Sequence, residues 1–127
     1  MSAALIKALR DARKRTVDLG AGKELTFLRP PEGDYDSMLT RVDNQAYWDI
    51  KLDHIVKYSV GWSGFTEVEI LGAGVGGDAV VPFDAQLWAE LLSDSLEWQV
   101  VVRQAIQQSM NDYNNKKDAD AKNSEPA

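Results

Sequence analysis

The sequence predicts an α+β fold that is mainly α-helical, with a small N-terminal β-hairpin packed on a bundle of about four to five helices. Two observations carry this prediction: polar and apolar residues alternate near the N-terminus, and apolar residues recur at helical spacing along most of the remaining chain. With 127 residues, 44 % of them apolar, the chain has the size of one compact domain. We assign residues 1–113 to a single globular domain and residues 114–127, where no apolar side chain is larger than alanine, to a flexible C-terminal tail.

The first elements are a helix and a hairpin. Residues 3–14 carry leucine and alanine at helical spacing after Ser2, which predicts an amphipathic helix that needs a partner to be stable. Residues 16–19 and 24–28 alternate around a glycine-bearing turn and are expected to pair as two strands. The inner face of this hairpin would comprise Val17, Leu19, Leu25 and Phe27.

The remaining elements are expected to be helices. The pattern of residues 34–41 predicts a short helix, and that of residues 46–60 predicts a longer helix at the centre of the fold. Asp84 is a plausible N-cap for a helix with Leu87, Trp88, Leu91 and Leu92 on one side. Residues 94–97 resemble a capping box that opens a long helix, and these last two helices should form a hairpin. The buried side of the long helix would comprise Trp98, Val101, Val102, Ala105, Ile106 and Met110.

Charge and composition exclude several classes of function. Residues 1–15 carry five basic groups against Asp11, whereas residues 32–97 carry thirteen carboxylates against three basic groups. Such an acidic body repels phosphate backbones, so we expect no nucleic-acid partner. The chain has no cysteine, no secretory signal and no apolar run long enough to span a membrane, which predicts a protein of the cytoplasm without a membrane partner.

The residues that could support catalysis are few. His54 is the only histidine, and Asp49 and Asp53 lie one helical turn apart beside it. That arrangement could hold a hydrated cation, but a helical ion pair between Asp53 and Lys57 explains it better. We therefore predict no enzyme activity, no catalytic residue, no metal site and no cofactor.

A glycine-rich segment invites a second interpretation. Residues 72–77 match the G-x-G-x-x-G pattern of dinucleotide-binding loops and follow the strand-like residues 68–71. The pattern needs a helix that begins within it, yet Asp78 to Pro82 favour extended chain. We expect a glycine-rich turn between two extended segments, residues 68–71 and 79–81, and keep a small nucleotide-binding protein as the less favoured alternative.

Two short motifs frame this loop and carry a family resemblance. They are Gly61-Trp62-Ser-Gly64-Phe65-Thr66 and Val81-Pro82-Phe83-Asp84, each at the start or end of a predicted helix. In this order the chain, over about residues 15–112, resembles the tail assembly chaperones of long-tailed (siphovirus-type) bacteriophages and prophages. The resemblance implies a protein of the host bacterial cytoplasm that binds the tape measure protein, keeps it soluble, recruits the tail-tube protein and forms homo-oligomers.

Aromatic and leucine side chains are the candidate contacts for such a client. Large aromatic residues dominate protein interfaces, and an acidic body would favour a basic client. An aromatic pair in a glycine-flanked loop is, however, more often part of a core, so both interpretations stay open. The alternative from the same setting is a structural head–tail or tail component of the phage. The candidate protein-binding residues are Trp62, Phe65, Phe83, Leu87, Trp88, Leu91 and Trp98.

Overall fold

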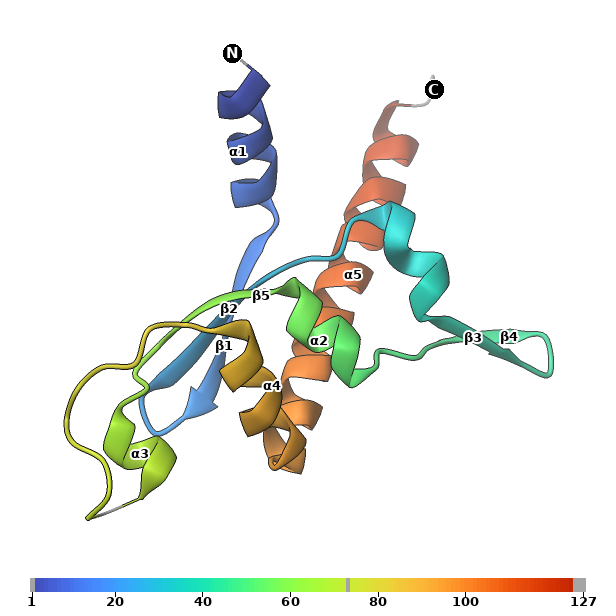
Figure 1. Cartoon of the computed structure of the whole chain (residues 1–127). Coiled ribbons are helices and arrows are strands. Elements are labelled where there is room, and N and C mark those ends of the chain that lie inside the picture. The colour runs from blue at the N-terminus through green and yellow to red at the C-terminus, as the bar shows by residue number, and fades with distance from the viewer. Residues whose placement is uncertain (1, 73, 125–127) are drawn as a thin grey trace.

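The computed structural model describes residues 2–72 and 74–124 and confirms the α+β, mainly helical class, with 55 % of residues in helices and 23 % in strands. Figure 1 shows a small sheet and the helices α2 (Leu52–Tyr58) and α4 (Ala85–Ser93) gathered around the first half of the long C-terminal helix α5 (Leu96–Ser124). The helix α1 (Ser2–Ala12) and the last turns of α5 extend beyond this body on the same side.

The predicted hairpin is present and belongs to a larger sheet. Strands β1 (Lys14–Gly20) and β2 (Lys23–Leu28) pair antiparallel, and β2 also pairs antiparallel with β5 (Ser59–Ser63), so β2 is the central strand. β2 ends before Pro30, since proline lacks the amide hydrogen of a ladder. Three residues of the predicted inner face, Leu19, Leu25 and Phe27, are buried, and Val17 is half-buried.

The prediction of one helix over residues 46–60 is wrong. This stretch contains strand β4 (Gln45–Trp48), helix α2 (Leu52–Tyr58) and the start of β5. β4 pairs with β3 (Leu39–Val42) through a turn in which Asp43 and Asn44 have φ values of 52° and 67°. Asparagine and aspartate tolerate this conformation, and its twist matches that of the flanking strands in a two-residue hairpin. The residues that follow the turn therefore continue as a strand and not as a helix. The short helix predicted over residues 34–41 is a 3₁₀ helix over Glu32–Met38.

The C-terminal helices agree with the prediction in position and in their buried faces. Asp84 caps α4 (Ala85–Ser93) by accepting a hydrogen bond from the Leu87 amide at 2.9 Å. The cap of α5 is Ser95 rather than Asp94: the Ser95 hydroxyl oxygen accepts a hydrogen bond from the Trp98 amide at 3.2 Å. Val102, Ile106 and Met110 on α5 are completely buried.

The expected flexible tail is helical over residues 114–124, while residues 125–127 lie outside the described residues. Composition takes no account of tertiary contacts, and the distal half of α5 makes such contacts. Lys117 pairs with Glu32 at 2.7 Å, and Tyr113 donates a hydrogen bond to the same carboxylate at 3.1 Å. These contacts hold the distal half of α5 to the start of the 3₁₀ helix.

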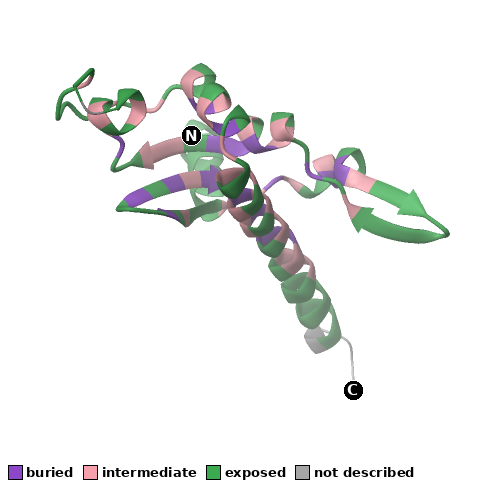
Figure 2. Ribbon diagram, turned by 90° about the horizontal axis from the view of Figure 1, so that it is seen from below, coloured by how far each residue is buried: buried purple, intermediate pink, exposed green. Residues whose placement is uncertain are grey.

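Burial divides the molecule in two. In Figure 2 the buried residues follow the sheet, α2, α4 and the first half of α5, whereas the last turns of α5 and the β3–β4 hairpin are exposed. None of the described residues of α1 is buried. The fold therefore combines a well-packed centre with helical ends that contribute little to the core.

Candidate protein-binding site

The structure brings the predicted aromatic residues together in one cluster, formed by Trp62, Phe65, Phe83, Trp88 and Trp98. The Trp62 and Phe65 rings stack with centroids 4.1 Å apart, and Phe83 meets Trp62 edge-on at 5.2 Å. Trp98 lies 5.7 Å from Phe65 and 5.9 Å from Trp88. These separations are typical of favourable aromatic contacts. The cluster joins β5, the loop after it, α4 and α5.

Burial makes this aromatic cluster mainly structural. Phe65 and Trp88 have no exposed surface, so they drop out of the set of side chains that a partner could contact. The indole nitrogen of Trp88 donates to the Ser59 hydroxyl at 2.9 Å, and that hydroxyl donates to the Ile55 carbonyl at 2.6 Å. The other five candidates, for which contact with a partner stays a prediction, are half-buried: Trp62, Phe83, Leu87, Leu91 and Trp98.

The two sequence motifs that frame the glycine loop are hydrogen-bonded to each other. The Val81 amide donates to the Phe65 carbonyl at 2.9 Å, and the Trp62 indole nitrogen donates to the Val81 carbonyl at 2.8 Å. Thr66 and Val80 form a β-bridge beside them. The motifs therefore act as one unit that fixes the start of α4 against the end of β5.

The glycine loop does not have the geometry of a phosphate-binding loop. Residues 67–71, expected to be extended in part, form the short helix α3 (Glu67–Leu71), and the bridge at Val80 leaves the chain extended after the loop. The first amides of α3 are already occupied, because Glu67 donates to the Ala79 carbonyl at 3.1 Å and Val68 to the Gly77 carbonyl at 2.9 Å. The dinucleotide-binding pattern needs a helix that begins within residues 72–77, whereas α3 ends at Leu71 and α4 begins at Ala85. Ala73, within the motif, lies outside the described residues.

Several titratable groups have structural partners, and one predicted pair is different. Lys57, expected to pair with Asp53, lies 3.6 Å from Asp34 instead. The Nδ1 atom of His54 accepts a hydrogen bond from the Lys51 amide at 2.9 Å and so helps to cap α2. The Tyr58 hydroxyl donates to Asp34 at 2.7 Å, and burial together with this bond raises the pKa of Tyr58 well above its usual value. Glu69 pairs with the nearly buried Lys23. Among the residues that the structure describes, no group of three or more potential ligands could hold a metal ion.

The clearest unpartnered apolar surface is on α1, which the sequence identified as an amphipathic helix but not as a site. Its three large apolar side chains, Leu5, Ile6 and Leu9, are 68 %, 57 % and 67 % exposed. Amphipathic helices of soluble proteins normally bury such a face. The signal was therefore in the sequence, but only the tertiary structure shows that the described part of the chain leaves this face uncovered.

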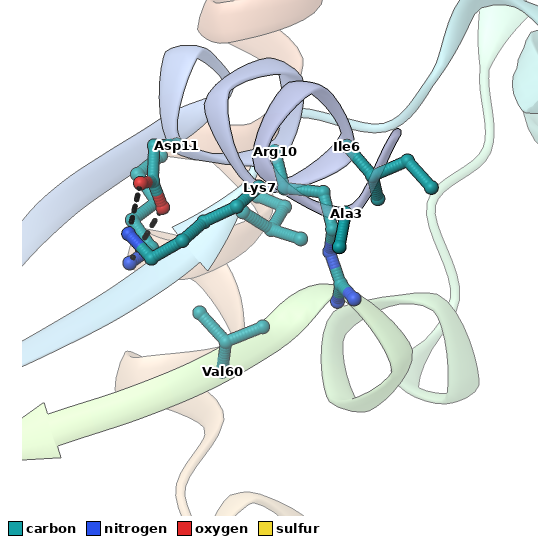
Figure 3. Close-up of a pocket in the computed structure, with 8 residues that line it drawn as sticks. Ala3, Ile6, Lys7, Arg10, Asp11 and Val60 are labelled. Atoms are coloured by element: carbon teal, nitrogen blue, oxygen red, sulfur yellow. Dashed lines mark hydrogen bonds and ion pairs between the residues drawn. The ribbon is translucent and has the colours of Figure 1, made fainter. Parts of the chain in front are cut away.

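One side of α1 borders an apolar groove. We call it the α1 groove: a hollow of about 460 Å³ between α1 and the edge of the sheet. Figure 3 shows Ile6 and Ala3 on α1 and Val60 on β5 around it, with Lys7 and Arg10 beside them. Val60 is 38 % exposed on the outer strand of the sheet. The apolar surface of α1 therefore continues onto β5.

The charges on α1 are partly neutralised within the helix. Asp11 accepts from Lys7 at 2.7 Å and pairs with Lys14 at 3.1 Å. The hydrogen bond from Lys7, followed by that from Lys14, lowers the pKa of the Asp11 carboxyl, and the same bond raises the pKa of Lys7. Arg10 of α1 and Arg13, which follows the helix directly, have no carboxylate partner among the described residues.

Comparisons of this chain with protein-family models, with curated proteins and with solved structures found no match. Within residues 2–72 and 74–124, no helix has both the length and the apolar character needed to cross a membrane. The sequence motifs and the geometry of the surface therefore bear on the function.

Proposed function

We propose that this protein is a tail assembly chaperone of a long-tailed bacteriophage or prophage, acting in the host bacterial cytoplasm. It would bind the tape measure protein, keep that protein soluble and recruit the tail-tube protein, with self-association as part of the same role. The observation that carries the proposal is the exposed apolar face of α1, since a binder of amphipathic helices needs an apolar surface that its own fold does not cover.

The size of this surface suits reversible binding. Burying a leucine or isoleucine completely contributes roughly 2 kcal/mol, so covering the exposed two thirds of three such side chains contributes about 4 kcal/mol. Association itself costs several kcal/mol. Additional contacts on the α1 groove would bring the affinity into a range from which a client can still be released. A chaperone needs that property and a permanent virion part does not.

The two sequence motifs support the same proposal in a different way. Their hydrogen bonds to each other give the segments that resemble the family one shared structural role, although they are separated by the glycine loop. His54 and Tyr58 make structural hydrogen bonds, and the exposed apolar side chains of α1 support a role in binding.

Co-expression with the tape measure protein encoded by the same phage tests the proposal. We expect the wild-type chain to raise the soluble fraction of that client and to co-elute with it on gel filtration. Leu5→Gln/Leu9→Gln should abolish both effects, because glutamine preserves helix propensity while removing apolar surface. The matched control is Leu71→Gln/Leu96→Gln, which changes two leucines that are 55 % and 73 % exposed outside α1.

Three results would reject the proposal. The client would stay insoluble with the wild-type chain, or the control pair would abolish binding as completely as the α1 pair. Mass spectrometry of finished particles would alternatively find the chain at a fixed copy number, as expected of a structural head–tail or tail component.

A further inference from the structure

A second cavity lies on the other side of α1, between that helix and the distal half of α5. We call it the α1–α5 cleft; its volume is about 630 Å³. Figure 1 shows the two helices extending from the body on the same side, and residues of both line this cavity. Its apolar lining comprises Leu9 and Ala12 from α1 and the ring of Tyr113 from α5.

The charge of this cleft is opposite to that of the whole chain. The chain carries a net charge of −6, yet the lining of the cleft has five basic side chains against two carboxylates, Asp112 and Asp120. The net charge of the lining is therefore +3, and its basic residues are Arg13, Arg15, Arg29, Lys116 and Lys117. A local surplus of this kind selects partners of the opposite sign.

Three of these five basic groups are already engaged and two are not. The Arg15 guanidinium donates to the Ala12 carbonyl at 3.1 Å and to the Lys14 carbonyl at 2.7 Å. The Arg29 guanidinium lies 3.9 Å from the centre of the Tyr113 ring, and Lys117 pairs with Glu32. By contrast, the Nε atom of Arg13 is buried without a hydrogen-bond partner, and the exposed Lys116 has no ion pair within the described part of the chain. Neither Arg13 nor Lys116 has a carboxylate partner within the described part of the chain, so an incoming carboxylate would supply the missing countercharge.

We infer that the α1–α5 cleft binds an amphipathic helix with an acidic polar face, presented by the client protein. The inference rests on the proposed function only in assigning that helix to the client. A helix fits because both walls are helices and because its apolar stripe would cover Leu9 and Tyr113. Its carboxylates would then reach Arg13 and Lys116. The acidity of the whole chain favours a basic client, but the charge of the cleft, where contact occurs, decides the partner.

Two fluorescein-labelled designed peptides test this inference against the full-length protein. Both are about five helical turns long with the same leucine stripe, and their polar faces carry either glutamate or lysine. Fluorescence anisotropy at low salt should show that the acidic peptide binds about tenfold more tightly than the basic one. This preference should shrink as salt is raised, because screening weakens the attraction.

Charge-matched variants locate the binding site. Arg13→Gln/Lys116→Gln removes two positive charges from the cleft and should weaken binding of the acidic peptide about tenfold. Arg41→Glu makes the same change in net charge on the exposed β3–β4 hairpin and should change binding less than about twofold. Circular dichroism of each variant should match that of the wild type, which separates lost binding from lost folding.

Three outcomes would overturn the inference. The two peptides bind with equal affinity, the basic peptide binds more tightly than the acidic one, or Arg13→Gln/Lys116→Gln leaves the affinity for the acidic peptide unchanged. The inference also fails if the protein ignores the peptides but binds anionic phosphatidylglycerol vesicles, or forms a dimer that the double variant abolishes. If co-expression raises the soluble fraction of the client but the protein does not prefer the acidic peptide, the inference about the cleft is rejected and the proposed chaperone function stands. If the protein prefers the acidic peptide but does not raise the soluble fraction of the client, the proposed chaperone function is rejected and the inference that the cleft binds an acidic helix stands.

Discussion

The hydrogen bond between Trp88 and Ser59 gives a direct test of the aromatic cluster as the centre of the fold. Trp88 has no exposed surface, and its indole nitrogen donates to the Ser59 hydroxyl at 2.9 Å. Trp88→Phe removes this bond, worth about 1 kcal/mol, and leaves a small cavity that costs about another 1–2 kcal/mol. We therefore expect the free energy of unfolding to fall by about 2–3 kcal/mol.

Ser59→Ala tests the same bond from the other side. It leaves the buried indole nitrogen without an acceptor, which costs about 1–3 kcal/mol. The double variant loses the bond only once, so its destabilisation should be smaller than the sum of the two single effects by about 1 kcal/mol.

Urea unfolding followed by far-UV circular dichroism measures all three variants. Trp48→Phe is the control, because Trp48 is only half-buried and its indole nitrogen donates to Asn111 at 3.0 Å. It should cost less than Trp88→Phe. Additive single effects, within about 0.3 kcal/mol, would show that the bond contributes nothing. A loss below about 0.5 kcal/mol for Trp88→Phe would show that Trp88 behaves as a surface residue and would refute the central role of the cluster.

Two further predictions concern the glycine loop and the distal half of α5. Gly76→Ala should lower the midpoint of thermal unfolding markedly, because a Cβ there would lie 2.5 Å from the Glu67 backbone. The control is Gly77→Ala, where a Cβ would have no atom within 4 Å. Equal midpoints for the two variants would contradict the packing of Gly76 against the start of α3. The hydrogen bond from Lys117, then that from Tyr113, lowers the pKa of Glu32, so this contact stabilises the fold above the ordinary carboxyl value of 4.5 and is lost as pH falls through the lowered pKa. Lys117→Gln should raise the pKa of Glu32 in an NMR titration, and an unchanged pKa would contradict the pairing.

Local signals in the sequence were sufficient for the elements that depend on neighbouring residues. The hairpin of β1 and β2 follows from alternation around a glycine turn, and the start of α4 follows from the capping of Leu87 by Asp84. The buried face of α5 follows from helical spacing alone. In each case the deciding contact is within a few residues.

Elements that depend on distant partners were predicted wrongly. Residues 46–60 show apolar spacing compatible with a helix, but Phe27 of β2 draws Ser59 into the sheet, and the Asp43–Asn44 turn commits Trp48 to a second hairpin. That turn was a readable signal, since both residue types tolerate left-handed backbone angles. The contact between Glu32 and Lys117 spans 85 positions, and no local pattern contains it.

The α1 surface was not singled out from the sequence for a related reason. Large aromatic residues are enriched both in cores and in interfaces, so their presence alone could not separate Phe65 and Trp88, which are buried, from residues available to a partner. The amphipathic pattern of α1 was read correctly, but it carries no information on whether another part of the chain covers its apolar face.

The packed centre of the fold and its exposed helical ends tolerate substitution differently. The aromatic cluster fixes the sheet, α4 and α5 relative to one another, while α1 and the distal half of α5 extend from that rigid base. Because Leu5, Leu9 and Lys116 are exposed, substitutions there change little of the folding free energy. Exposed positions of the α1 groove and the α1–α5 cleft can therefore vary with little loss of stability, whereas substitutions in the aromatic cluster destabilise the base that holds both helices in place.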